Sequence, residues 1–456
     1  MRKYGAAIGA VIALVLACLT LLSGCSVVGL DSKSLMSPPK EEGERGEIHS
    51  LLIDTAGGDI TFRYPRKGEY RSAIITKDFT GDRQNDAIAL YEAPDDSGGT
   101  TISFLISQNG SWKVLRSFTN TAVQVDRVCF ADLDDDGSLE VVVGWGSSTT
   151  NSSSACVYDY AQGGVIEIPM EQSYGEMAVT NLVDNAQDEL CIVTLASDTS
   201  EALVQIIRLS EGALRIVEAA TLDPSVLQYS QMSVGLIAAE TTGILLDGIR
   251  ADNSMITQII YWNSKKETLE TPYSGNSNQP QSQTLNITSR NAAAAYPSRD
   301  IDGDSIIEFP VVNTLPGNSD TSKDPAAYLV NWNQFDIETK TPIRTMSTVI
   351  NSNDGFWFLF PDSWRDRITC RSDTTTHCTT FYEWLPKEGN GTGAVGAAVL
   401  KIQVFNTEEW ESGNSGFTQI AERGGLIYAA AIPEENHELA PSIQEVQDSF
   451  YFLYTE

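Results

Sequence analysis

A short acidic turn that recurs along the chain constrains the fold more than any other feature of the sequence. Its fullest form runs from Asp132 to Glu140, and copies with the same internal spacing start at Asp78 and Asp300. A worn copy, Asn181 to Glu189, carries Val183 where the other copies carry Asp or Thr. The first three copies in chain order begin 54 and then 49 residues apart. A period near 50 residues indicates one supersecondary unit repeated along the chain.

Short apolar runs stand on both sides of these turns. Arg127 to Phe130 precedes the fullest turn, and Val141 to Trp145 follows it. Continuous β-rich runs of this length suit strands that are buried on both faces. With about four strands per unit, the pattern predicts a mainly β chain with a β-propeller of about five blades at residues 47–352. The expected blades run approximately over Tyr70–Asn120, Val123–Met170, Tyr174–Leu222, Ser225–Ser274 and Leu285–Asn351.

A propeller must close its ring, and the alternating segment Asp59 to Tyr64 is a candidate for that role. We expect it to form a strand that pairs with the last blade. A short helix over Glu47 to Thr55 is expected to precede it. An elongated blade array is the alternative, and it is less favoured because it would leave exposed sheet edges.

The spacing of the acids within each turn predicts calcium sites. Oxygen-bearing side chains at positions 1, 3, 5 and 9 of a turn can converge on one hard cation, and calcium takes six to eight oxygens. Gly137 permits the bend that folds these side chains inward. The candidate ligands are Asp132, Asp134, Asp136, Glu140 and the Ser138 carbonyl in the fullest turn, Asp300, Asp302, Asp304 and Glu308 in the late turn, and Asp78, Thr80, Asp82 and Asp86 in the early turn.

Acidic turns also occur without calcium and in other calcium-binding folds. Asp and Asn favour turns without any metal, and this simpler interpretation is preferred for the Asn181 copy. An EF-hand is excluded because its loop needs a bidentate Glu at position 12 and flanking helices. Position 12 is Val143, Val311 or Ala89 in the three acidic copies, and the flanks indicate strands.

The pattern Asp-x-Asp-x-Asp-Gly-x-x-Glu at 132–140 and its variant at 300–308 resemble the FG-GAP or VCBS repeats of integrin-like β-propellers. The resemblance implies four strands per blade and a structural calcium ion in the loop between the first two strands. The Phe-Gly and Gly-Ala-Pro signatures of that family are absent. The integrin function is therefore not carried over to this chain.

The N-terminus has the pattern of a targeting segment. Arg2 and Lys3 precede an apolar stretch from Ala6 to Leu22, and the small residues that follow are typical of a secretory signal at 1–24. The ending Leu-Ser-Gly-Cys closely resembles a bacterial lipobox, which implies lipidation of Cys25. An uncleaved anchor or a plain signal peptide is the alternative. We expect an extracytoplasmic chain, lipid-anchored to the bacterial cell membrane, with a flexible tether at 25–46.

The overall charge limits the partners. The chain has 30 basic and 61 acidic residues, and such an acidic surface repels nucleic acid and anionic lipid. We therefore expect no nucleic-acid partner. The expected partners are the membrane, through the lipid anchor, and an unidentified protein or glycan.

From about residue 353 the pattern changes. Strands are expected at Thr379–Trp384, Ala398–Phe405, Phe417–Glu422 and Leu426–Ile432. A helix with Ser442 and Glu445 at capping-box spacing ends the chain. Residues 353–456 are thus predicted to form a small α+β domain, an antiparallel sheet plus a C-terminal helix, with Trp357 and Trp364 in its core rather than in a ligand groove.

The cysteines suggest one covalent link. Cys370 and Cys378 flank a polar loop between two expected strands, which suits a hairpin disulfide in an oxidising compartment, with two free thiols as the alternative. Cys129, Cys156 and Cys191 lie in strand patterns and are expected to be small core residues.

No catalytic signature is present in the sequence. The three histidines are far apart and show no zinc spacing, and no nucleophile elbow, P-loop or dinucleotide motif occurs. No catalytic residue is assigned. We expect a non-enzymatic binding or scaffold module with structural calcium. The alternatives are a glycan-active hydrolase or lyase that uses propeller carboxylates, and an envelope scaffold without any small ligand.

Overall fold

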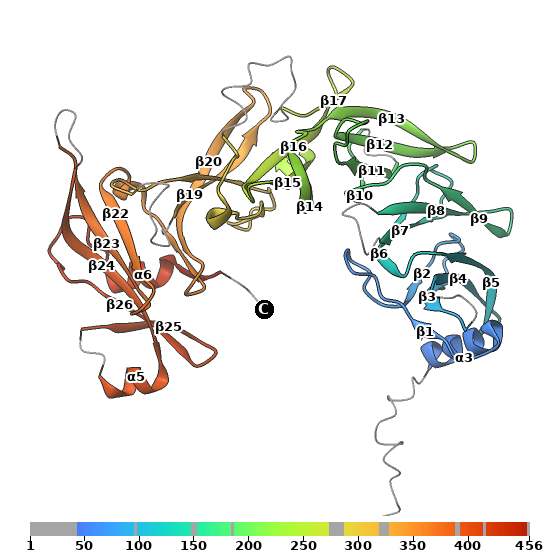
Figure 1. Cartoon of the computed structure of the whole chain (residues 1–456), viewed down its shortest axis with the longest axis horizontal. Helices are drawn as coiled ribbons and strands as arrows, with labels where there is room; N and C mark the ends of the chain where they lie inside the picture. Colours follow the sequence, from blue (N-terminus) through green and yellow to red (C-terminus); the bar gives the residue numbers. More distant parts are fainter. Residues whose placement is uncertain are drawn as a thin grey trace, which may run out of the picture.

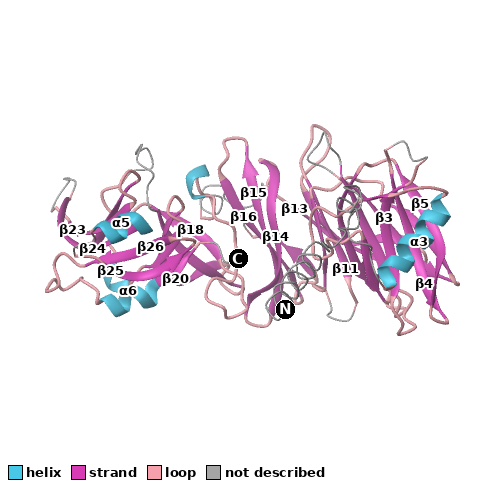
Figure 2. Cartoon of the chain, turned by 90° about the horizontal axis from the view of Figure 1, so that it is seen from below, coloured by secondary structure: helices cyan, strands magenta, loops and turns pink. Residues whose placement is uncertain are grey.

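The protein forms an arch of small antiparallel sheets. The computed structural model describes residues 43–94, 98–146, 153–183, 187–272, 287–318, 328–387, 393–413 and 416–453. Six sheets follow one another along the arch from the N-terminal to the C-terminal end (Figure 1). Viewed from below, they stand side by side in one row (Figure 2). The predicted signal at 1–24 and Cys25 lie outside the described residues.

Helix α3 (Glu44–Ala56) opens the described chain and covers the first sheet. Its apolar residues Ile48 and Leu52 are fully buried against Ala87 and Leu105 of that sheet. The helix ends at Gly57, which adopts a left-handed conformation that glycine takes at little cost. The helix begins three residues before the predicted one, so the end of the predicted tether at 25–46 is helical.

The first four sheets are built from consecutive strands. The first contains β1 (Thr61–Phe62), β2 (Ile74–Lys77), β3 (Asp86–Glu92), β4 (Thr100–Gln108) and β5 (Ser111–Asn120). The second contains β6 (Gln124–Ala131), β7 (Glu140–Gly146), β8 (Ser154–Ala161) and β9 (Gly164–Pro169). The third contains β10 (Glu176–Thr180), β11 (Glu189–Thr194), β12 (Leu203–Ser210) and β13 (Ala213–Thr221). The fourth contains β14 (Val226–Ala238), β15 (Thr241–Arg250), β16 (Met255–Asn263) and β17 (Thr268–Glu270).

The last two sheets are less regular. The fifth contains β18 (Phe309–Asn313), β19 (Tyr328–Asp336), β20 (Thr341–Asn351), β21 (Phe356–Leu359) and the last strand of the chain, β27 (Phe450–Phe452). The sixth contains β22 (Ile368–Asp373), β23 (Cys378–Leu385), β24 (Ala394–Asn406), β26 (Leu426–Ala431) and β25 (Thr418–Arg423). The short helices of this half are η1 (Ala292–Ala294), η2 (Asp362–Trp364), α5 (Thr407–Ser412) and α6 (Ile443–Ser449). None of the described helices combines the length and apolarity needed to cross a bilayer.

The core lies between successive sheets. Leu90 and Phe104 of the first sheet pack with Val141 and Tyr158 of the second, and corresponding clusters join the second to the third and the third to the fourth. Strands such as β3 and β7 are therefore buried on both faces over almost their whole length, which explains their continuous apolar sequences. The mainly β fold class is confirmed.

The predicted ring closure is wrong. Strand β1 pairs with β3 in the first sheet, with Thr61 opposite Glu92 and Phe62 opposite Tyr91. No strand of the first sheet pairs with the fifth within the described residues. The two ends of the arch stand apart in Figure 1. The alternating pattern of Asp59 to Tyr64 identified a strand, but alternation carries no information about the partner strand.

The C-terminal region shares both strands and core with the fifth sheet. β21 pairs with β20, with Val349 opposite Phe358, and β27 adds to the other edge of β21, with Phe358 opposite Phe450, so backbone pairing crosses the predicted boundary at residue 353. The predicted helix is confirmed as α6, whose Ser442 and Glu445 form the expected capping box. Its Val446 is fully buried in one cluster with side chains of both sheets. Trp364 is a core residue of this region, as predicted. Trp357 is also buried, but it packs with β19 and β20 of the fifth sheet and lines a cleft.

The predicted disulfide is also wrong. Cys370 and Cys378 are free thiols. The register of β22 and β23 puts Cys370 opposite Phe381 and Cys378 opposite Asp373, so the two cysteines are three residue pairs apart. At roughly 3.3 Å per residue this separation is about 10 Å, which exceeds the reach of a disulfide. Cys156 and Cys191 are buried, as predicted, and Cys129 is half-buried.

Candidate functional site

The Asp78 turn connects β2 to β3, the Asp132 turn connects β6 to β7, and the Asp300 turn precedes β18. All three follow one backbone path. In each turn, positions 4 and 6 have a positive φ. These residues are Gly81 and Arg83 in the Asp78 turn, Asp135 and Gly137 in the Asp132 turn, and Gly303 and Ser305 in the Asp300 turn. Only one of the two positions is glycine in each copy, although only glycine adopts this conformation freely. The three turns are therefore one loop design.

The Asp at position 1 accepts hydrogen bonds from backbone N–H groups later in its own turn. The two carboxylate oxygens of Asp132 accept hydrogen bonds from the N–H groups of Asp136 and Gly137, both at 3.1 Å. Asp300 accepts in the same way from Gly303 and Ser305, at 2.7 and 3.0 Å. These bonds hold the loop closed and turn positions 3 and 5 toward position 1.

The acid at position 9 binds the backbone at the start of its turn. It accepts a hydrogen bond from the backbone N–H of position 2 in all four copies. The pairs are Asp86 with Phe79 at 3.2 Å, Glu140 with Leu133 at 2.6 Å, Glu189 with Leu182 at 2.8 Å, and Glu308 with Ile301 at 3.0 Å. Position 9 therefore has a structural role in every turn, including the worn one.

The structure gathers the predicted ligands unequally. Carboxylate oxygens of Asp132, Asp134 and Asp136 lie within 4.8 Å of one another, and so do those of Asp300, Asp302 and Asp304. The latter three side chains are exposed. The acids of the Asp78 turn form no such group in the described part of the chain, and its Asp82 is bonded to Gln84. Ser138 is buried, and its N–H and hydroxyl both donate to Asp136.

The Asp132 turn contains buried carboxylate oxygens that have no hydrogen-bond partner. Glu140 is fully buried, and its Oε1 has no partner, while Oε2 caps the turn. One oxygen of Asp134 is in the same state. Burial, together with the charges of Asp134 and Asp159, raises the pKa of Glu140 to about 8. Desolvation and the charge of Asp136 also raise the pKa of Asp134.

Asp159 is a functional candidate that the sequence analysis missed. It lies on β8, only 6% of it is exposed, and its Oδ1 has no hydrogen-bond partner. The register of β7 and β8 puts it opposite Glu140 at the acidic turn, and burial, followed by the charges of Asp134 and Asp136, raises its pKa. It is 19 residues after Glu140 in sequence, and only the pairing of β7 with β8 brings the two together.

In the Asn181 and Asp300 turns, a side chain of the neighbouring strand contacts the acids of the turn. Arg208 on β12 donates to Glu189 at 2.7 Å and neutralises the worn turn. The amide of Gln334 on β19 donates to Asp304 and to Glu308, both at 2.8 Å. The five acids of the Asp132 site, counting Asp159, have no ion pair recorded in the described residues.

The turns also join one sheet to the next. Leu139 in the Asp132 turn donates its N–H to the carbonyl of Phe79 in the Asp78 turn, at 2.9 Å. The carbonyl of Leu133 accepts from Leu209 of the third sheet at 2.9 Å. In the Asp300 turn, Ile307 donates to Leu236 of the fourth sheet at 2.7 Å. Any ion in these turns would therefore stabilise contacts between sheets as well as the loop.

Three clefts of the described structure lack paired carboxylates. They have volumes of about 510, 650 and 700 Å³ and are lined, among others, by Glu201, by Asp366 and by Asp300, respectively. Each of these clefts contains a single carboxylate, whereas glycoside hydrolysis needs two.

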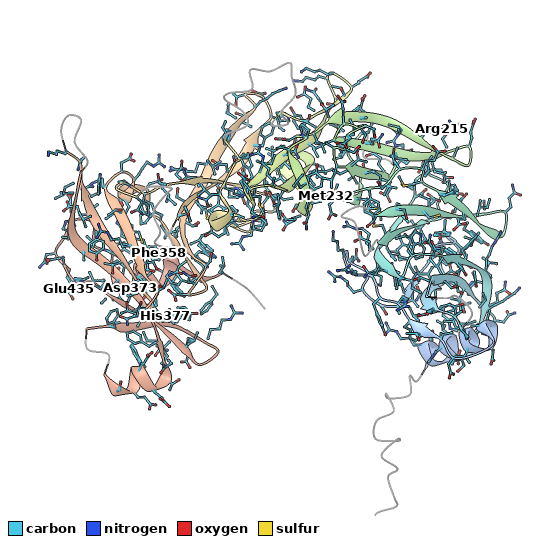
Figure 3. All side chains as sticks on the ribbon, viewed as in Figure 1. Arg215, Met232, Phe358, Asp373, His377 and Glu435 are labelled. Atoms are coloured by element: carbon cyan, nitrogen blue, oxygen red, sulfur yellow. The ribbon has the colours of Figure 1, made fainter. Side chains whose placement is uncertain are left out.

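The histidines form no nucleophile–base pair in the described part of the chain. His377 lies at the sixth sheet, with Asp373 close by on the same hairpin (Figure 3). Its Nδ1 contacts Asp354 at 2.6 Å, and its side chain is largely exposed.

Comparisons with known proteins show no family. No family model matches the chain, and no curated protein matches it. Among solved structures, a protein from Lactobacillus plantarum has a TM-score of 0.32 and 9% identity, covering 74% of this chain and 94% of that one. The Dos1 propeller has a TM-score of 0.31 and 10% identity, covering 81% and 68%. A Bacillus licheniformis rhamnogalacturonan lyase has a TM-score of 0.29 and 11% identity, covering 75% and 81%. All three scores are below 0.5, so neither the fold nor the function of this chain follows from them.

Proposed function

We propose that this chain is a non-enzymatic binding or scaffold module outside the cytoplasm, built from propeller-type blades and stabilised by calcium. The observation that carries the proposal is the Asp132 turn. It gathers three aspartates within 4.8 Å and leaves buried carboxylate oxygens without hydrogen-bond partners. Buried like charges are costly unless a counter-charge compensates them. A hard cation with oxygen ligands supplies that charge.

The calcium role in this proposal is structural. The turn belongs to the second sheet and forms hydrogen bonds with the first and the third sheets. The ion would therefore stabilise the loop and its contacts with both of these sheets. With about 1 mM external calcium and an assumed dissociation constant of about 0.1 mM, one site adds about 1.4 kcal/mol to the free energy of unfolding. The catalytic alternative gains no support, since the clefts described above lack paired acids.

The melting temperature of the full chain, measured with calcium and with a chelator, tests this role. We expect calcium to raise the melting temperature, and we expect Asp134→Ala to reduce most of the rise. Asp302→Ala should reduce it less, because the Asp300 cluster is exposed and Gln334 already bonds to Asp304 and Glu308. An unchanged melting temperature in calcium would refute the calcium role and leave the turns as ordinary acidic loops.

The membrane anchor is proposed from the lipobox-like sequence that ends at Cys25. The chain made in a bacterium should incorporate a labelled fatty acid and sediment with membranes. The Cys25→Ser variant should lose the label and remain in the soluble fraction. Membrane association that survives this change would mean that the apolar segment is an uncleaved anchor instead.

A further inference from the structure

The residue that faces position 9 on the neighbouring strand differs among the four turns. The register that pairs Val141 with Tyr158 puts Asp159 opposite Glu140. The corresponding registers put Arg208 opposite Glu189, Gln334 opposite Glu308, and Ile106 opposite Asp86. One structural position therefore carries a negative, a positive, a neutral polar and an apolar side chain in turn.

We propose that Asp159 is a fifth carboxylate of a cation site at the Asp132 turn, and that the residue facing position 9 decides which turns take up a cation. This inference rests on the proposed calcium role and extends it to a residue outside the turn. Calcium needs more oxygens than one such loop supplies from its side chains. Asp159 adds an oxygen from a different strand, and its Oδ1 is buried and has no partner.

The other three turns fit the same rule. At the Asn181 turn, the guanidinium of Arg208 contacts Glu189 and supplies a fixed positive charge. At the Asp300 turn, the amide of Gln334 donates to two of the acids, so both oxygens of Glu308 have partners. At the Asp78 turn, Ile106 offers no oxygen. The Asp132 turn differs from them, because three of its aspartates lie within 4.8 Å of one another and Asp134, Glu140 and Asp159 each keep a buried oxygen without a hydrogen-bond partner.

Terbium(III), a luminescent substitute for calcium, provides the test. The full chain is purified in detergent in an Asp302→Ala background, so that the signal reports the Asp132 turn. Tyr158 lies on β8 opposite Val141, the residue that follows this turn, and can sensitise terbium emission. We expect Asp159→Asn to weaken terbium binding about tenfold or more, the equivalent of about 1.4 kcal/mol. The calcium affinity, measured by displacement of terbium, should fall to the same extent. Asp198→Asn, which removes an exposed acid of the third sheet, is the control and should bind like the parent.

A reciprocal variant tests the rule by a gain of binding. This variant is Gln334→Asp, with Asp302 intact and with Asp134→Ala to remove the site at the Asp132 turn. It should bind terbium more tightly at the Asp300 turn than the Asp134→Ala chain does. If the parent binds calcium and Asp159→Asn binds equally well, the inference is overturned while the calcium role survives. If the parent does not bind calcium or terbium at all, both the calcium role and the inference fail. Weaker binding in Asp159→Asn with an unchanged Asp198→Asn supports both.

Discussion

At the scale of single residues, the same chemical group serves different purposes according to its surroundings. Glu140 and Glu308 occupy the same position in two turns, and each accepts a hydrogen bond from the backbone N–H of position 2 in its own turn. Glu308 has its second oxygen bonded by Gln334, whereas that of Glu140 has no partner. Both copies carry acids at positions 1, 3, 5 and 9, and the difference at position 9 comes from one residue on the next strand.

A buried ion pair outside the turns provides the clearest stability prediction. Asp247 and Arg290 are both fully buried, 2.9 Å apart, and Asp247 also accepts hydrogen bonds from Thr257 and Ser298. Asp247→Ala would leave the Arg290 charge buried without its partner. We expect a loss of about 3–5 kcal/mol in the free energy of unfolding, measured by urea denaturation.

Two variants control this prediction. Asp252→Ala removes an exposed acid from the turn between β15 and β16 and should change the free energy of unfolding by less than about 0.5 kcal/mol. The double variant Asp247→Leu with Arg290→Met should recover part of the loss, because no unpaired charge remains. A small effect of Asp247→Ala alone would show that water reaches Arg290 in solution.

At the scale of elements, local patterns predicted most strands, and non-local pairings were beyond them. The runs beside the turns gave β7 and β11 because each strand is continuously apolar. The capping box of α6 was visible in Ser442 and Glu445. The partner of β1, the return of β27 and the position of Asp159 all depend on which strands pair. Sequence periodicity predicts that a strand exists but not its neighbour.

The stacking of neighbouring turns leads to a second prediction. A Cβ atom added to Gly81 would lie 2.5 Å from the carbonyl oxygen of Gly137 in the next turn. Gly303 has a similar φ, and an added Cβ would meet nothing within 4 Å. Both alanine variants strain the backbone, by about 1 kcal/mol, but Gly81→Ala must also push two turns apart. We expect it to cost about 1–3 kcal/mol more, measured by melting temperature; equal losses would show that the turns do not stack in solution.

At the scale of the whole molecule, the arch depends on contacts between neighbouring sheets. The fourth and fifth sheets are tied by Lys340, which contacts Glu270 of β17 at 2.6 Å. Burial alone would raise the pKa of Glu270, but hydrogen bonds from Lys266, Lys340 and Tyr261 outweigh it and lower the pKa to about 2. This junction is therefore sensitive to acid.

The sign of the pKa shift fixes the pH dependence of this junction. Because the folded-state pKa of Glu270 lies below the usual glutamate value of 4.5, the stabilisation is complete above about pH 4.5 and is lost as the pH falls toward 2. We expect the parent chain to lose more melting temperature than Glu270→Gln when the pH falls from about 6 to about 3. The variant should start lower at the higher pH. Parallel acid losses in the two chains would contradict the role of Glu270.

The return of β27 to the fifth sheet has a consequence for how the protein is made. The first four sheets consist of consecutive strands, so each can form as soon as its own segment has been synthesised. The fifth sheet needs β27, which lies about 90 residues after β21 in the sequence. We therefore expect its outer edge to stay open until residues 450–452 have been synthesised. A nascent chain halted before Phe450 would present that edge to chaperones and proteases, which would allow the cell to recognise a chain that lacks β27.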